Sequence, residues 1–305
     1  MLQTIFSADF FAAILRATTP ILFATLAAAV AAKCGIINMA LEGMMLFSAL
    51  FGVIFSSMTQ SWLAGLLITM VLGGLIGLIL AFFVLNLKTD EILAAIAINL
   101  VATGGTVLLM LAYSGDRGTS TSIQSVPAPA LHIPFLQDIP VLGDLLSGHN
   151  LLVYLALIAV VVIHLFLYKT PLGLRIRAVG ETKNAAESVG ISSRRVQYIA
   201  LTISGVLVSM GGFFMSGGYM SMFTKDMAAG RGYIALAASS MGGNTPIGGF
   251  LVSVLFGIAQ AVANVMQLTT IPTEMIQMLP YLTTLVGLGI YSYSRMKKRQ
   301  RLAGK

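Results

Sequence analysis

Polar side chains that could bind a solute or a proton recur inside the apolar segments of this chain. Asn38 and Glu42 are four residues apart in GIINMALEGMM, which would place them on one helix face, and Asn99 lies in INLVATGGT. A third set forms a stripe in FGIAQAVANVMQ: Gln260, Asn264 and Gln267. Because polar groups are costly at membrane depth, we expect all of them to face protein or water. They either line a solute path or join helices as packing contacts, and both interpretations stay open.

The sequence lacks the patterns of common catalytic and nucleotide-binding sites. There is no HExxH zinc motif, no GxSxG nucleophile turn, no Walker A glycine loop and no pair of membrane aspartates. The single cysteine, Cys34, has no partner for a disulfide or a metal site. We therefore expect a non-catalytic chain that does not hydrolyse ATP by itself and uses no cofactor or metal.

The elements that must position these polar groups are membrane helices. With 57% hydrophobic and 10% charged residues and a mean hydropathy of +0.91, the chain of 305 residues cannot be a soluble domain. Runs long enough to span a bilayer predict an all-α polytopic bundle of eight or nine helices. The predicted spans are 10–32, 36–57, 62–87, 91–113, 150–168, 197–217, 247–268 and 275–294, with a short ninth element at 232–243.

Positive charge predicts the orientation of the bundle. Of the 18 Lys and Arg residues, six lie in the segment 169–197 and six in the tail 295–305. Cytoplasmic loops carry the excess of such residues, so both regions and the C-terminus are predicted to be cytoplasmic. The N-terminus is then external if 232–243 crosses the membrane, and its side is undetermined if that segment is re-entrant.

The net charge of +7 follows from this topology, and we expect no nucleic-acid partner. Arg16 lies near enough to a helix end to snorkel, so it needs no special role.

The chain reads as one transmembrane domain over residues 1–305. Its first helical half spans 10–113, and the proline-containing segment 114–149 forms an external loop. The second half spans 150–294 and contains the charged segment 169–197. Small residues predict helix-packing faces, both at Gly73 and Gly77 and in the stripe after the charged segment. That stripe comprises Thr202, Gly205, Ser209, Gly212 and Ser216.

Three motifs resemble those of ABC importer permeases of the ribose, branched-chain amino acid and nucleoside group. GLRIRAVGETKNAAESVGIS from Gly173 is similar to their coupling segment, GIINMALEGMM to their GxxNxxxEGxM signature, and IALAASSMGGNTPIGG to a late Gly-rich element. Within this group, the residues EGMM are most similar to the sequence of the purine nucleoside branch. One departure is Thr182-Lys183, where the group often has Asn-Pro, so the start of the docking helix is open.

The resemblance implies a function and its partners. This chain would be the permease of an ATP-driven importer, with residues 178–191 forming a helix that docks on a separate cytoplasmic ATPase. The residues implied in that contact are Arg177, Gly180, Glu181, Ala185, Ala186 and Gly190. A second homologous permease, giving a heterodimer, an extracytoplasmic substrate-binding lipoprotein and a bacterial plasma membrane are also implied. The solute would be a purine nucleoside such as guanosine.

Other functions remain open on the sequence alone. The same architecture could import a simple sugar such as ribose or branched-chain amino acids. An ion-coupled carrier would need an ionisable residue within the membrane, for which Glu42 is the clear acidic candidate. A scaffold without transport would leave the polar stripes unexplained. The long charged segment favours the ATP-driven importer, because it supplies a cytoplasmic surface for a partner.

Overall fold

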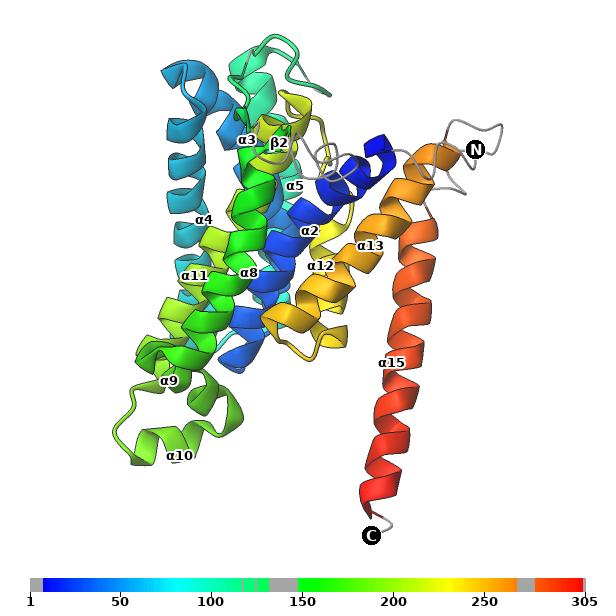
Figure 1. Cartoon of the computed structure of the whole chain (residues 1–305). Coiled ribbons are helices and arrows are strands. Elements are labelled where there is room, and N and C mark those ends of the chain that lie inside the picture. Colours follow the sequence, from blue (N-terminus) through cyan, green and yellow to red (C-terminus); the bar gives the residue numbers. More distant parts are fainter. Residues whose placement is uncertain (1–7, 117, 124, 132–147, 268–277, 304–305) are drawn as a thin grey trace.

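The chain forms a bundle of long helices, shown in Figure 1 by a computed structural model that describes residues 8–116, 118–123, 125–131, 148–267 and 278–303. The long helices are α2 (Ala8–Lys33), α3 (Leu41–Thr59), α4 (Trp62–Leu85), α5 (Glu91–Ser114), α8 (Leu151–Lys169), α11 (Ser193–Phe213), α13 (Pro246–Met266) and α15 (Leu279–Ala303). The short ones are α9 (Pro171–Glu181), α10 (Lys183–Ser188), the π-helix η1 (Phe214–Met220) and α12 (Arg231–Met241).

The predicted helical membrane bundle is confirmed. Seven helices among the described residues are long and apolar enough to cross a membrane, and they coincide with seven of the eight predicted spans. The remaining prediction, 275–294, falls on α15 from residue 279 onward; α15 is not among the seven, and residues 275–277 lie outside the described part of the chain. The span predicted from residue 36 is wrong at its start, because 36–40 form a turn and α3 begins at Leu41.

Helix α2 lies at the centre of the bundle and packs against α8, α11, α12 and α13. The C-terminal half of α2 is rich in alanine, and its residues from Ile21 to Ala31 are almost completely buried. Small side chains let neighbouring backbones approach closely, which is how helices associate when no water is available to drive them together. The hydrogen bond from Ser253 Oγ to Thr25 Oγ1, at 3.0 Å, joins α13 to α2 inside this core.

The small-residue faces predicted from the sequence pack α4 against α11. A Cβ atom added to Gly205 would lie 2.0 Å from the carbonyl oxygen of Gly73, and one added to Gly77 would lie 2.4 Å from that of Leu201. No side chain fits at such distances, so the two helices are in contact through their backbones. The prediction of helix-packing roles for Gly73, Gly77 and Gly205 is confirmed.

The short element predicted at 232–243 is α12, which begins inside the bundle. Helices α11 and α13 run in the same direction, so the chain between them returns through the bundle by residues 221–230 followed by α12 (Figure 1). With 11 residues, α12 extends about 16 Å at 1.5 Å per residue, roughly half of a hydrocarbon core. The crossing is thus made half by irregular chain and half by helix.

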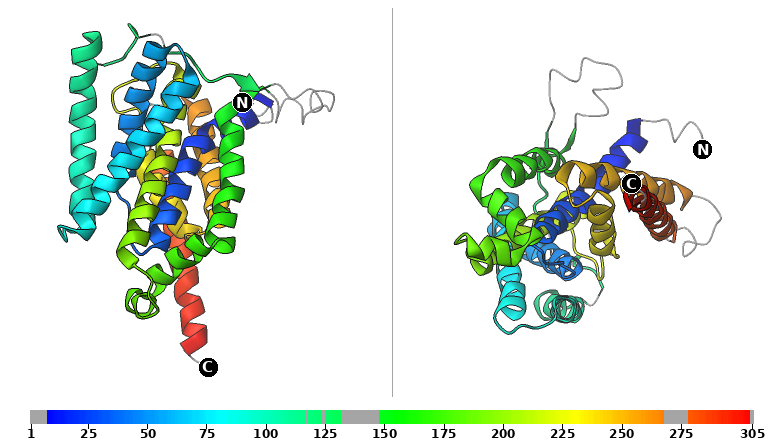
Figure 2. Two further views of the ribbon diagram at one scale, coloured as in Figure 1. Left: turned by 90° about the vertical axis from the view of Figure 1, so that its left-hand side faces the viewer. Right: turned by 90° about the horizontal axis from the view of Figure 1, so that it is seen from below.

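The two ends of the bundle carry different elements. The segment α9–α10 and the end of α15 lie at one end, as the shared positive charge predicts (Figure 1). At the other end, β1 (Ala130–Leu131) and β2 (His149–Asn150) pair as a two-residue antiparallel ribbon beside the start of α8. Residues 132–147 of the predicted external loop lie outside the described part of the chain. Figure 2 shows α5 at the outer edge of the bundle, against α3.

Candidate functional site

Glu42 is a helix cap supplied from a neighbouring helix. It lies in the first turn of α3 and is 7% exposed. Its Oε1 accepts a hydrogen bond from the Gly230 N–H at 2.7 Å, and its Oε2 accepts one from the Gly232 N–H, also at 2.7 Å. These N–H groups open α12, whose N-cap residue provides no side-chain cap. A carboxylate there satisfies free donors and complements the positive end of the helix dipole.

The approach of α12 to α3 needs a glycine. A Cβ atom added to Gly232 would lie 2.6 Å from the Glu42 backbone nitrogen and 2.8 Å from Glu42 Oε2. The carboxylate therefore sits against the backbone of α12 with no room for a side chain or a solute between them. The predicted pairing of Asn38 and Glu42 on one helix face is wrong, because Asn38 lies in the turn before α3.

Asn38 and Asn99 hold the turn that precedes α3. Asn38 Nδ2 donates to Ser204 Oγ at 3.0 Å on α11, and its Oδ1 accepts from the Ala40 N–H at 3.0 Å. Asn99 Oδ1 accepts from the Gly43 N–H at 2.8 Å. Its Nδ2 donates to the Met39 carbonyl at 2.9 Å and to the Tyr233 hydroxyl at 3.1 Å. Both amides thus bind the protein itself, which is the packing interpretation left open by the sequence.

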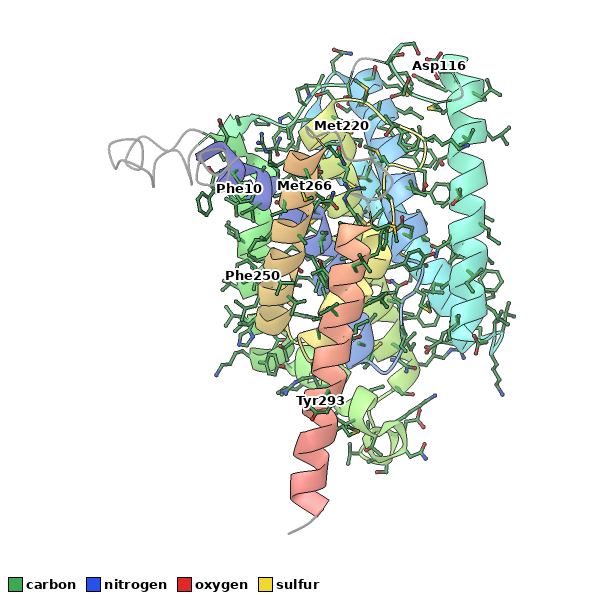
Figure 3. All side chains as sticks on the ribbon, turned by 90° about the vertical axis from the view of Figure 1, so that its right-hand side faces the viewer. Phe10, Asp116, Met220, Phe250, Met266 and Tyr293 are labelled. Atoms are coloured by element: carbon green, nitrogen blue, oxygen red, sulfur yellow. The ribbon has the colours of Figure 1, made fainter. Side chains whose placement is uncertain are left out.

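The stripe on α13 lies apart from this cluster. Gln260 Nε2 donates to Asn264 Oδ1 at 3.2 Å, and both residues line a small pocket of about 100 Å³. Gln267 is the exposed C-cap of α13 and does not line that pocket. The pocket also contains Met220, which lies toward the same end of the bundle as Asp116 (Figure 3).

Two arginines line the same pocket, and the sequence did not predict either of them there. Arg16 comes from α2 and Arg231 from the first turn of α12. Arg231 Nη1 also donates to the Met227 and Ala228 carbonyls, at 2.8 and 3.2 Å. A basic residue near the start of an apolar helix is the only sequence signal for Arg16, and it is equally typical of snorkelling.

A larger cavity of about 420 Å³ lies between α2, the turn before α3, α12 and α15. It contains the amides of Asn38 and Asn244 and two serine hydroxyls. Tyr233, which no sequence argument singled out, lines it with 46% of its surface exposed. The feature of the sequence that could have identified Tyr233 is its position directly before the Gly-rich run 234–249.

A second cavity, of about 360 Å³, adjoins the first on the side of the charged segment. Ala32 and Asn244 line both cavities. The second one also contains Lys33 from the end of α2 and Arg177 and Glu181 from α9. Asn244 has a left-handed backbone with φ of 54°, held by a 2.7 Å hydrogen bond from its N–H to the Ser239 carbonyl. The bundle therefore has a series of two hollows that leads to α9.

The charged segment folds as two helices, so the predicted single helix 178–191 is wrong. Thr182 has an extended backbone, with φ of −152° and ψ of 98°, which ends α9 and starts α10 at Lys183. Ala185 is exposed, whereas Ala186 is 4% exposed and packs inward. Gly190 has φ of 84°, a left-handed conformation that glycine adopts freely, and it turns the chain toward α11.

Helix α9 is fixed to the end of α2. A Cβ atom added to Gly180 would lie 2.2 Å from the Lys33 carbonyl oxygen. The Arg177 guanidinium lies 4.5 Å from the centre of the Tyr168 ring on α8, as a cation–π contact within the chain. Displacement of α9 would therefore act directly on α2 and α8. Glu181 is exposed at the end of α9, next to the exposed face of α10.

Comparisons with known proteins find similarity to permease proteins of ABC transporters. NupQ of Bacillus subtilis, a guanosine ABC transporter permease protein, is 33% identical over 88% of this chain and 87% of its own length. NupC of Lactococcus lactis subsp. cremoris, a nucleoside ABC transporter permease protein, is 30% identical over 90% and 89%. TsgC13 of Haloferax volcanii, named as a candidate glucose ABC transporter permease protein, is 29% identical over 84% and 77%.

No solved structure matches the chain. The profile of the family described as branched-chain amino acid transport system / permease component matches residues 10–288, a range that includes both cavities, the Glu42 cap and the α9–α10 segment. A multi-pass helical membrane protein with this match and these relatives belongs to that family of permease components.

Proposed function

We propose that this chain is the non-catalytic permease subunit of an ATP-driven importer of purine nucleosides, guanosine among them. The observation that carries the proposal is the continuous connection from an exposed helix, α10, through α9 to α2 and the cavities that α2 lines. A push on α10 would reach α2 through the contact of α10 with α9 and of α9 with α2. The named substrates of NupQ and NupC supply the solute class.

A partner ATPase would bind the exposed faces of α10 and the end of α9. Ala185 and Gly190 offer small surfaces that a partner can approach, and Glu181 supplies an exposed charge beside them. Val189, 74% exposed at the end of α10, is an apolar group of the kind that interfaces bury. We propose that Arg177, by contrast, stiffens α9 through Tyr168 and does not contact the partner directly.

The remaining parts of the transporter follow from this role. A second homologous permease would complete the solute path, and an extracytoplasmic binding lipoprotein would deliver the nucleoside at the end that carries β1 and β2. The basic residues of the α9–α10 segment and of the tail support a cytoplasmic location for those elements in a bacterial plasma membrane. The start of α2 would then be external, because it lies at the opposite end of the bundle from the end of α15 (Figure 1).

An ion-coupled carrier is not favoured by the environment of Glu42. A carboxylate that exchanges protons or cations during transport must be accessible to them, and this one is 7% exposed and accepts two backbone hydrogen bonds. Its geometry suits a permanent structural contact. The proposed energy source is therefore outside the chain.

The test is ATP-driven uptake of labelled guanosine by the assembled transporter in proteoliposomes, with ribose and leucine measured alongside. We expect guanosine uptake alone. Ala185→Trp and Glu181→Lys should each abolish coupling, because they alter the exposed surface that we assign to the ATPase. Leu100→Trp, an apolar exchange at a 69% exposed position on the outer helix α5, is the matched control and should transport normally.

Two results would contradict the proposal. Uptake of ribose or leucine in place of guanosine would overturn the substrate. Parental guanosine uptake in both α9–α10 variants, at equal amounts of assembled protein, would overturn the assignment of the docking surface.

A further inference from the structure

The 420 Å³ cavity has a chemical character that restricts its occupant. It has amide and hydroxyl groups but no charged side chain among the described residues that line it. A charged solute at membrane depth needs a counter-charge, so this lining suits a neutral one. Apolar side chains make up the rest of the lining, and a mainly apolar wall with a few polar groups is the usual composition of a small-molecule site. Its polar lining consists of Asn38, Tyr233, Ser239, Ser240 and Asn244.

Among the described residues that line this cavity, Tyr233 is the one aromatic group, and its position is fixed from two sides. The hydroxyl accepts a hydrogen bond from Asn99 Nδ2 at 3.1 Å. The helix that carries it, α12, is held at its N-terminus by the two hydrogen bonds to Glu42. Tyr233 as a whole residue nevertheless keeps 46% of its surface exposed, and it lines the cavity together with Met39 and Leu236. An anchored and accessible ring is pre-organised for a flat ligand.

We propose that Tyr233 stacks against the purine base of the nucleoside as it passes through this cavity, and that it favours nucleosides over free sugars. This inference rests on the proposed function. Aromatic rings bind bases by stacking with little dependence on which base is present, which suits a permease for several nucleosides. Ser240 and Asn244 lie on the same wall and provide hydrogen-bonding groups for the polar edges of the solute.

The lining also predicts what is excluded. A nucleoside 5′-monophosphate carries about two negative charges, and the described residues of this cavity offer no cation to balance them. Lys33 and Arg177 belong to the adjoining cavity beyond Asn244. Nucleotides should therefore fail to occupy the Tyr233 site even at concentrations at which guanosine does.

The test is photolabelling of the assembled transporter with 8-azidoguanosine, which carries its reactive group on the base, followed by peptide mapping. We expect labelling of the α12 peptide that contains Tyr233, with competition by guanosine and none by ribose or guanosine 5′-monophosphate. Tyr233→Leu should lower this labelling about tenfold or more, the effect of losing one stacked base. Tyr233→Phe keeps the ring and should retain it. Tyr113→Leu, at a 51% exposed tyrosine of α5, is the control and should not change it.

The outcomes separate the two proposals. Guanosine uptake by the parental transporter is measured first, and its absence overturns the proposed function. With uptake present, labelling confined to other peptides, or labelling of α12 that Tyr233→Leu leaves intact, overturns the role of Tyr233. Loss of labelling in Tyr233→Phe as well as Tyr233→Leu also overturns it, because that result assigns the effect to the hydrogen bond with Asn99 and not to the ring.

Discussion

Removal of the Glu42 carboxylate should release the start of α12 from α3. The carboxylate accepts two backbone hydrogen bonds at 2.7 Å in a site that is 7% exposed. Each charge-assisted bond contributes about 1.5–3 kcal/mol, so Glu42→Ala should lower the free energy of unfolding by about 3–6 kcal/mol. Glu42→Gln keeps one acceptor but turns an NH₂ group toward the other N–H, and should lower it by about 2–3 kcal/mol.

Two measurements check this prediction. Unfolding of the purified chain in mixed micelles, titrated with a denaturing detergent, gives the change in stability. Hydrogen exchange of the 226–241 peptide reports locally on the Gly230 and Gly232 amides, which should lose protection in both variants even if Glu42→Ala folds poorly. Glu91→Gln is the matched control. Glu91 accepts a single N–H, from Ile37 at 3.1 Å in an exposed position, and glutamine can replace it within about 1 kcal/mol.

A parental unfolding midpoint together with parental protection of the Gly230 and Gly232 amides in Glu42→Ala would refute the capping role. Loss of stability without loss of protection at α12 would refute it too, because the effect would then arise elsewhere in α3. Protection lost in Glu91→Gln to the same extent as in Glu42→Gln would contradict the graded magnitude.

Two further predictions concern the end of the bundle that carries α9 and α10. Gly180→Ala places a methyl group 2.2 Å from the Lys33 carbonyl oxygen, so it should force α9 away from α2 and abolish guanosine uptake while ATP hydrolysis stays at the parental rate. The control is Gly104→Ala, because an added Cβ there meets nothing within 4 Å. Normal uptake in Gly180→Ala would contradict the coupling path. Burial raises the pKa of the Cys34 thiol from 9.0 to about 12, so the folded chain holds this proton as the pH rises from 9 to 12, the unfolded chain releases it, and stability falls over that range. At pH 8 roughly one thiol in 10⁴ is ionised, and maleimide should label Cys34 only after unfolding; labelling of native membranes would contradict the burial.

Much of the fold could be predicted because membrane helices are encoded locally. A spanning helix needs a run of apolar residues and satisfies its own backbone hydrogen bonds, so length and composition are enough to find it. The helix-packing faces were also visible in the sequence, since Gly73, Gly77 and Gly205 permit a backbone contact that bulky residues forbid, but the pairing of α4 with α11 was not. The break between α9 and α10 could not be predicted from length and composition, because it depends on the extended backbone of a single residue, Thr182.

The candidate site was harder to predict because its members come from distant parts of the chain. Glu42 and Gly232 are 190 residues apart and meet only because α12 begins inside the bundle, beside the first turn of α3. The spacing suggested that Glu42 and Asn38 share one helix face. Asn38 instead lies in the turn before α3, so the two side chains are not on the same face. Tyr233 has an ordinary sequence context, and only the cavity beside it gives it a candidate role.

The sequence by itself determined that this chain is a multi-span helical membrane protein with a charged segment between two apolar runs, because hydropathy and charge act residue by residue. The tertiary structure decided which polar groups satisfy one another and which face a hollow. Burial, partner choice and cavity shape depend on how α2, α3, α12 and α13 meet. The contacts of α12 and α13 with α2, and of α12 with α3, join residues that the linear sequence keeps far apart.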